Sequence, residues 1–141
     1  MKRFVRVVSF VLILATILAF PVYAVEESQR ASRFFASYRA YCYKASSTDL
    51  RVYFSVVATG AMDELGTSSI KVQRSSDGTN WTTMKTYTKE NYPQMVDTDA
   101  GFHSGYISYT ATTGYYYRAY VEFYAKDSGS TGYLYYYTEK I

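Results

Sequence analysis

Ile70–Tyr87, with the sequence IKVQRSSDGTNWTTMKTY, is the most informative stretch of this chain of 141 residues. Apolar and polar side chains alternate at its start, as they do in a β-strand that buries one face. Asp77 and Gly78 then supply the chemistry of a tight turn, and a second strand opens at Trp81, the only tryptophan. The stretch therefore predicts a β-hairpin in which Asp77 and Gly78 shape the turn and Trp81 belongs to the core.

The same period of two continues on both sides of this hairpin. Further strands are predicted at residues 34–44, 50–59, 106–110, 115–126 and 133–140. In the strand at 115–126, the inward face is predicted to carry Tyr115, Tyr117, Ala119, Val121, Phe123 and Ala125. Frequent turn signals between short strands predict an all-β fold, an antiparallel two-sheet sandwich of about seven strands.

Two segments interrupt the pattern of strands. In Gly60–Gly66 (GAMDELG), Met62 and Leu65 are three residues apart, a spacing that predicts one helical turn. Residues 87–102 contain Pro93, which is incompatible with a central strand. We therefore expect a short helical turn in the first segment and a long crossing connection in the second.

The first 24 residues have the layout of a secretory signal peptide. Basic residues precede an apolar run over 7–20, and Ala24 ends the segment shortly before an acidic pair. The run is about 14 residues long, short of the roughly 20 that a membrane-spanning helix needs. The sequence predicts cleavage after Ala24, a flexible lead over 25–33 and a single domain over 34–141. We expect a secreted, extracellular protein with no membrane association after cleavage.

Cleavage also changes the charge of the chain. Of its 15 Lys and Arg residues, Lys2, Arg3 and Arg6 leave with the first 24 residues, so 12 remain beside 12 Asp and Glu. The mature chain is formally neutral and its basic residues are scattered, which gives no electrostatic footprint for nucleic acid. We therefore expect no nucleic-acid partner.

Few residues could carry chemistry. His103 is the only histidine and Cys42 the only cysteine, so a catalytic triad or a zinc site has little to draw on. Asp97–Gly101 (DTDAG) begins like a calcium loop, but the distal glutamate is missing. We expect no catalytic residue, no metal and no cofactor. Cys42 is predicted to be a buried apolar residue, with a dimer-forming thiol as the alternative.

Two stretches resemble fibronectin type III and related immunoglobulin-like modules. Val72–Trp81 (VQRSSDGTNW) is similar to their third strand and following turn, and Gly114–Val121 (GYYYRAYV) is similar to their sixth strand. The resemblance implies that Tyr115 is the tyrosine-corner residue, whose hydroxyl bonds to the backbone. With Ala58–Gly66 (ATGAMDELG), the pattern also resembles small secreted proteins of unknown function from Gram-positive gut bacteria. That resemblance implies an extracellular bacterial origin and no activity.

Tyrosine dominates the composition, since the chain holds 18 tyrosines and only Tyr23 lies in the leader. On the last two predicted strands, tyrosines recur on the face opposite the core, at Tyr116, Tyr120, Tyr124, Tyr133, Tyr135 and Tyr137. Rigid amphipathic rings give a large contact area at low entropy cost, so we expect an extracellular glycan or protein partner. The rings could equally fill a half-exposed surface by cross-strand pairing. The alternative function is a structural cell-envelope protein that forms homo-oligomers through its last strand.

Overall fold

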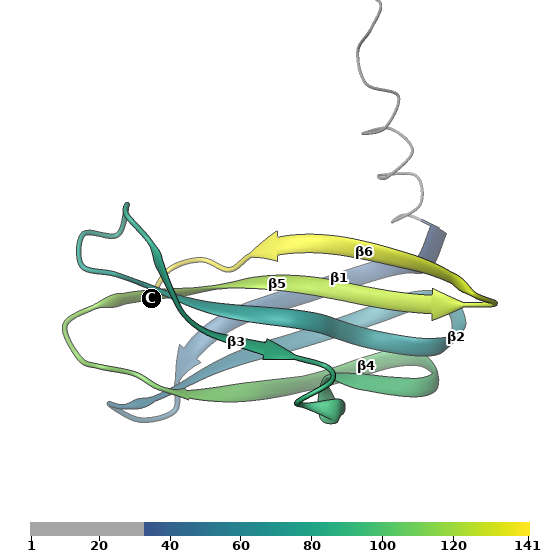
Figure 1. Cartoon of the computed structure of the whole chain (residues 1–141), viewed down its shortest axis with the longest axis horizontal. Helices are drawn as coiled ribbons and strands as arrows, with labels where there is room; N and C mark the ends of the chain where they lie inside the picture. The colour runs from purple at the N-terminus through teal and green to yellow at the C-terminus, as the bar shows by residue number, and fades with distance from the viewer. Residues whose placement is uncertain (1–32) are drawn as a thin grey trace, which may run out of the picture.

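A computed structural model describes residues 33–141 of the chain. The predicted signal peptide over 1–24 and, apart from Arg33, the predicted lead over 25–33 lie outside the described residues. The described elements, drawn in Figure 1, are β1 (Phe35–Lys44), β2 (Asp49–Ser75), β3 (Thr82–Thr88), the 3-10 helix η1 (Pro93–Met95), β4 (Val96–Thr110), β5 (Tyr116–Asp127) and β6 (Ser130–Tyr137).

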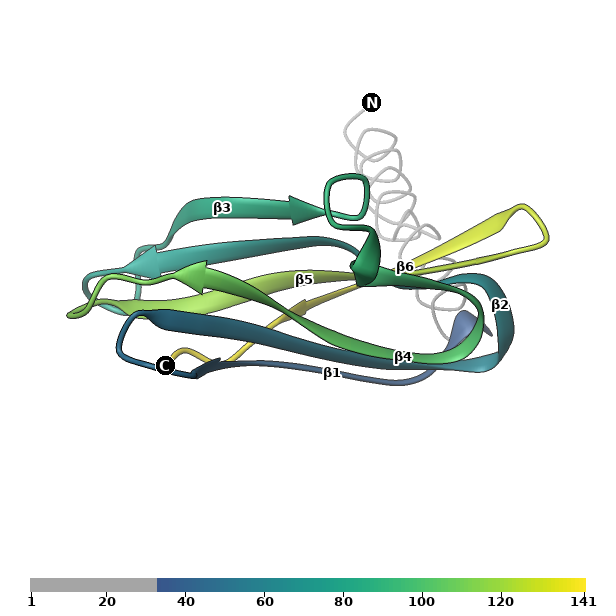
Figure 2. The same cartoon turned by 90° about the horizontal axis from the view of Figure 1, so that it is seen from below.

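The six strands of this region are antiparallel and form one hydrogen-bonded sheet, with β1, β2, β5 and β6 in that order and with β3 and β4 both paired to β2. The prediction of an all-β antiparallel fold is confirmed. The described sheet differs from the prediction of about seven strands in two sheets, because it has six strands and is not divided. Figures 1 and 2 show that the sheet curls, so that β1 and β4 lie on one side of the molecule and β3 and β5 on the other.

β2 connects the two sides because it runs through both of them. It is 27 residues long. Its first part pairs with β1 and β4, and its second part pairs with β3 and β5. The pairing register shifts between Val57 and Met62 against β4, and between Thr67 and Ser69 against β5. Such irregularities increase the local bend and twist of a strand, which lets β2 turn from one side of the curled sheet to the other.

The helical turn predicted at Gly60–Gly66 is wrong, because these residues are extended and belong to β2. Met62 and Leu65 are nevertheless both buried. Leu65, Gly66 and Thr67 are buried in succession, so both faces of the strand are covered where β2 turns the corner of the sheet. An apolar spacing of three therefore arises from a strand that changes its buried face, and a helical period is not needed to explain it.

The long connection predicted over 87–102 is also shorter than expected. β3 continues to Thr88, and β4 already begins at Val96, so the short strand predicted at 106–110 is only the end of β4. Pro93 lies at the start of η1, where a missing backbone N–H leaves no helical hydrogen bond unmade.

The core fills the inside of the curled sheet. The alternation predicted for residues 50–58 is confirmed, and that predicted for residues 115–126 is confirmed over 116–123. The side chains with at most 1 % of their surface exposed include Leu50, Val52, Phe54 and Val56 of β2, and Tyr117, Ala119, Val121, Phe123 and Ala125 of β5. Tyr115, which was also predicted to point inward, is only partly buried and packs against this cluster.

The hydroxyl bond expected of Tyr115 is made by Tyr117 instead. The Tyr117 hydroxyl accepts the backbone N–H of Thr112 at 2.8 Å and donates to the carbonyl oxygen of Thr112 at 3.2 Å. Tyr115 lies under a cation, with Cζ of Arg74 at 4.2 Å from its ring centroid. The resemblance placed the bonded tyrosine two residues too early, because three tyrosines follow one another there and any of them fits the pattern.

Side chains join the edges of the curled sheet on both of its open sides. On one side, Sγ of Cys42 in β1 lies 3.3 Å from Oγ1 of Thr138, just beyond β6. On the other, the Tyr87 hydroxyl of β3 donates to the carbonyl oxygen of Ser108 in β4 at 2.7 Å. The prediction that Cys42 is buried is confirmed. Burial raises the pKa of its thiol, which disfavours the thiolate that forms disulfides.

Candidate functional site

The predicted tyrosines lie on the outer face of β5 and β6. These strands are neighbours, and their register places Tyr120 opposite Tyr137 and Tyr124 opposite Tyr133. Directly opposed residues of an antiparallel pair point to the same side of the sheet. Four of the predicted binding residues are exposed on this face, namely Tyr116, Tyr133, Tyr135 and Tyr137, and Tyr120 is half-buried between them.

Tyr124 is the exception, because only 4 % of it is exposed. Nζ of Lys89 lies 4.1 Å above its ring centroid, and the Tyr133 ring lies 5.5 Å from it. Lys89 is fixed by Glu64, whose carboxylate is 3.0 Å away. The prediction that Tyr124 belongs to the exposed binding face is therefore wrong: its strand position points outward, but the turn after β3 covers it.

Five side chains of this face form a continuous series, which we call the aromatic row: Tyr135, Tyr120, Tyr137, Arg118 and Trp81. The rings of Tyr120 and Tyr135 are stacked, 7° from parallel with centroids 5.7 Å apart. The ring centroid of Tyr137 lies 4.5 Å from that of Tyr120. Cζ of Arg118 is 4.5 Å from the centroid of Tyr137 and 4.4 Å from the Trp81 ring, so its guanidinium lies between two aromatic faces.

Trp81 belongs to this surface and not to the core, so the prediction of its burial in the core is wrong. It is half-buried, just before β3 begins at Thr82. Arg118 holds its place because its Nε donates to Oε1 of Gln73 on the neighbouring β2 at 2.8 Å. A sequence offers no local sign of this arrangement, because Trp81, Gln73 and Arg118 come together only through strand pairing.

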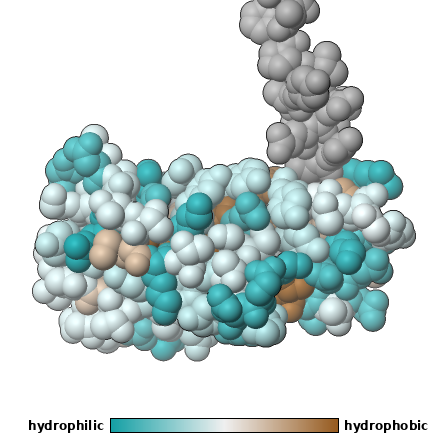
Figure 3. Space-filling model, viewed as in Figure 1, coloured by the Kyte–Doolittle hydropathy of each residue, from teal (hydrophilic) through white to brown (hydrophobic). Residues whose placement is uncertain are grey.

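Cations and hydroxyl groups surround the aromatic row. Nζ of Lys71 lies 6.0 Å from the Tyr120 centroid, and Nζ of Lys140 lies 5.2 Å from that of Tyr116. Partial burial raises the pKa of Tyr120, helped by the neighbouring Tyr137, so its hydroxyl keeps its proton and can donate. Figure 3 shows this side of the molecule as pale residues of intermediate hydropathy between teal hydrophilic ones. The surface is therefore amphipathic, because its aromatic rings are apolar and carry polar hydroxyl groups.

The turn of the hairpin is held by Asp77. Its Oδ1 accepts the backbone N–H groups of Thr79 and Asn80, both at 2.8 Å, and the hydroxyl of Ser75 at 2.8 Å. Gly78 has a φ of 75°, in the left-handed region that glycine tolerates best. The hydrogen bonds from Asn80 and Thr79 lower the pKa of Asp77 far below its ordinary value. The turn therefore prefers the ionised carboxylate.

Asp77→Asn is expected to weaken the acid sensitivity of the fold. A carboxyl group whose pKa is lowered on folding contributes stability above its unfolded pKa of about 4, and that contribution is lost as the pH falls further. Between about pH 4 and pH 2, the melting temperature of the wild type should therefore fall more steeply with decreasing pH than that of Asp77→Asn. Melting curves from neutral to acid pH test this, with Asp99→Asn in β4 as the control. Parallel acid profiles for the wild type and Asp77→Asn would contradict it.

A second series of tyrosines, which we call the opposite row, lies on the outer face of β1, β2 and β4. The register places Tyr41 opposite Tyr53 and Tyr53 opposite Tyr106, so the three form a line across the strands. Cζ of Arg39 lies 5.0 Å from the Tyr41 centroid, and Cζ of Arg51 lies 4.7 Å from that of Tyr106. This row was not predicted, although Tyr41 and Tyr53 occupy outward positions of two strands joined by a short turn.

The residues considered for catalysis and metal binding do not gather into a site. His103 is partly buried, its Nε2 donates to the carbonyl oxygen of Gln94 at 3.0 Å, and its Nδ1 is 4.0 Å from Asp97. Asp97–Gly101 lies within β4 and not in a loop. In residues 33–141, no three His, Cys, Asp or Glu side chains are close enough to hold a metal ion. No helix in this same range is long and apolar enough to cross a membrane.

Comparison of the chain with family models, with curated proteins and with solved structures gives no match. The resemblance to fibronectin type III and immunoglobulin-like modules thus rests on Val72–Trp81 and Gly114–Val121 alone. What the structure establishes is an antiparallel all-β protein with exposed tyrosines on two outer faces of one curled sheet.

Proposed function

We propose that this is a secreted, non-catalytic protein of the β-sandwich type that recognises extracellular glycans through the aromatic row. The observation that carries the proposal is the contact series from Tyr135 through Tyr120, Tyr137 and Arg118 to Trp81. Cross-strand pairing alone accounts for single contacts between tyrosines. It does not account for a guanidinium held between two aromatic faces at the surface.

The chemistry of the aromatic row suits sugars. A pyranose ring has a face rich in C–H groups that can rest on an aromatic ring, and its rim of hydroxyls needs donors and acceptors. Tyrosine supplies both in one rigid side chain, and Lys71 and Glu122 add charged groups beside Tyr120. A linear series of platforms favours a glycan chain over a monosaccharide, because successive sugars can each contact one member.

A double substitution tests the proposal. Tyr135→Ala with Tyr137→Ala removes two exposed rings of the aromatic row, and Tyr41→Ala with Tyr106→Ala removes two exposed rings of the opposite row as the matched control. After a glycan array has identified a bound glycan, titration calorimetry should show at least about a tenfold weaker affinity for the first variant, as for aromatic anchors elsewhere. The control should bind like the wild type. No signal on the array, or equal losses in both variants, would refute the proposal.

Self-assembly through β6 is the second candidate function. Among the described strands β6 pairs only with β5, so its outer edge has no backbone partner. Contacts on that side come from side chains, such as the rings of Tyr38 and Tyr136 at 5.9 Å. An edge of this kind can pair with another copy. Light scattering over a concentration series separates the two functions, because a protein that stays monomeric at high concentration cannot assemble in this way.

A further inference from the structure

A cleft opens on the side of the molecule where β3 and β4 face each other. Both strands are edges of the sheet, since each pairs only with β2 among the described strands. The cleft has a volume of about 700 Å³, within the range of small-molecule sites. Residues of β3, of β4 and of the connection between them line it: Lys85, Tyr87, Tyr92, Gln94, His103, Ser104, Gly105, Tyr106, Ile107 and Ser108.

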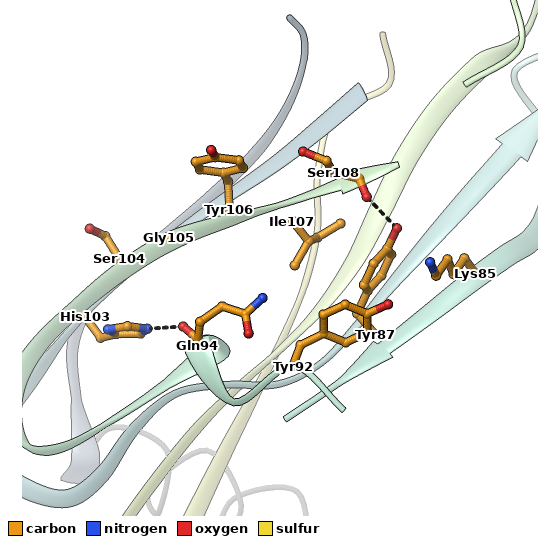
Figure 4. Close-up of a pocket in the computed structure, with 10 residues that line it drawn as sticks. All are labelled: Lys85, Tyr87, Tyr92, Gln94, His103, Ser104, Gly105, Tyr106, Ile107 and Ser108. Atoms are coloured by element: carbon orange, nitrogen blue, oxygen red, sulfur yellow. Dashed lines mark hydrogen bonds between the residues drawn. The ribbon is translucent and has the colours of Figure 1, made fainter. Parts of the chain in front are cut away.

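The inner walls of the cleft carry apolar side chains that are held in place by their contacts. Ile107 is 3 % exposed and points into the space between the two strands (Figure 4). Tyr87 closes one side with its hydroxyl bonded to the carbonyl oxygen of Ser108, and the ring of Tyr92 packs on it at 4.9 Å. The amide of Gln94 points toward Ile107 (Figure 4), and the backbone of Gln94 is held by His103. The cleft thus has aromatic and aliphatic side chains along its inner walls, and the amide of Gln94 is one of several polar groups beside them.

Lys85 gives the cleft its charge. Its Nζ lies over two aromatic rings, 4.7 Å from the centroid of Tyr87 and 5.9 Å from that of Tyr92. In residues 33–141, no carboxylate lies within ion-pair distance of it, and none lines the cleft. A hydrogen bond with the Tyr92 hydroxyl raises the pKa of Lys85, so the ammonium is charged at neutral pH. The mouth of the cleft is therefore positive.

Inward-facing lysines also occur on edge strands because they hinder pairing with other chains. That role explains a charge at this position, since Lys85 is opposite the buried Val72. Hindering strand pairing does not require a cavity beside the charge, and it does not require the rings of Tyr87 and Tyr92 beside the ammonium. The combination of all three has the composition of a ligand site, with apolar walls and a few placed polar groups.

We propose that this cleft binds a small organic monoanion, a carboxylate attached to an aromatic or aliphatic body. The carboxylate pairs with the ammonium of Lys85, the body lies against Tyr92 and Ile107, and the amide of Gln94 donates to a polar substituent. A single lysine suits one carboxylate, whereas recognition of phosphate groups generally draws on several donors. The site is separate from the aromatic row and does not depend on glycan binding there.

Binding of 2-naphthoate and of its neutral analogue 2-naphthalenemethanol, followed by NMR titration of the full-length mature chain, tests the proposal. We expect 2-naphthoate to shift the amide signals around Lys85, Tyr92 and Ile107, and the alcohol to bind about threefold to fivefold more weakly, as expected for loss of one exposed ion pair. Lys85→Met should reduce affinity for the acid to that of the alcohol, while Lys85→Arg should retain most of it.

Lys71→Met, which removes a lysine from beside the aromatic row, is the matched control and should bind 2-naphthoate like the wild type. Lys85→Gln repeats the test should Lys85→Met self-associate, because glutamine keeps the edge polar. Saturation absent at millimolar ligand, shifts that map to the aromatic row, or equal affinity for acid and alcohol would each overturn the proposal. A failure of glycan binding leaves these measurements unaffected, since the two sites share no residue.

Discussion

Gly66→Ala is expected to lower the free energy of unfolding by about 3 kcal/mol, the cost of overpacking a site that cannot relax. A Cβ at Gly66 would lie 2.1 Å from the carbonyl oxygen of Met95 and 2.8 Å from Cα of Val96. Both are backbone atoms at the junction of η1 and β4, so no side-chain rotation can relieve the clash. The position is also central, because Gly66 pairs with Val96 on one side and Tyr124 on the other.

Gly60→Ala is the matched control for this prediction. Gly60 lies in the same strand, but a Cβ there would meet no atom within 4 Å. Replacing it should leave stability unchanged or raise it slightly, because alanine restricts the unfolded chain. Urea unfolding followed by Trp81 fluorescence gives both midpoints. Equal midpoints for the two variants would contradict the close approach of β2 to Met95.

Arg118→Ala is expected to release Trp81 and to destabilise the protein by about 2 kcal/mol, from two cation–π contacts and one charged hydrogen bond. The guanidinium covers Trp81 and Tyr137 and is bonded to Gln73. Without it, the indole should become more exposed to water. Because Trp81 is the only tryptophan, its emission should shift to the red and its quenching by acrylamide should increase.

Two variants separate the geometry of Arg118 from its charge. Arg118→Lys keeps the cation but loses the planar face that lies between two rings, so it should recover only part of the stability. Arg39→Ala removes an arginine that covers Tyr41 in the opposite row and should leave Trp81 emission unchanged. If acrylamide quenches the Trp81 fluorescence of Arg118→Ala no more than that of the wild type, the contact between Arg118 and Trp81 does not persist in solution.

Most of β5 could be predicted from sequence because residues 116–123 are buried on one face only. Tyr117, Ala119 and Val121 are fully buried and alternate with more exposed residues, so a period of two appears directly in the sequence. β2 is different, since it passes from one side of the sheet to the other within a single strand. Around Leu65, consecutive residues of β2 are buried because the strand turns a corner there, so burial does not alternate. The spacing of Met62 and Leu65 therefore predicted a helical turn.

Part of the aromatic row could likewise be predicted from local sequence, and part of it could not. A turn of only two residues joins β5 to β6, so their register and the shared face of Tyr120 and Tyr137 follow from local sequence. Arg118 and Trp81 meet only because β2 pairs with both β3 and β5, and such long-range pairing is not visible in an alternating pattern. The burial of Tyr124 by Lys89 has the same non-local origin.

β2 hydrogen-bonds to four other strands, β1, β3, β4 and β5. No pair of neighbouring strands can leave the sheet without breaking a ladder to β2, so its central amides should exchange with deuterium only through global unfolding. The same pairings join residues far apart in the chain, which makes folding slow compared with that of locally paired proteins. Both sides of the molecule, and the surfaces they carry, should therefore form and melt together.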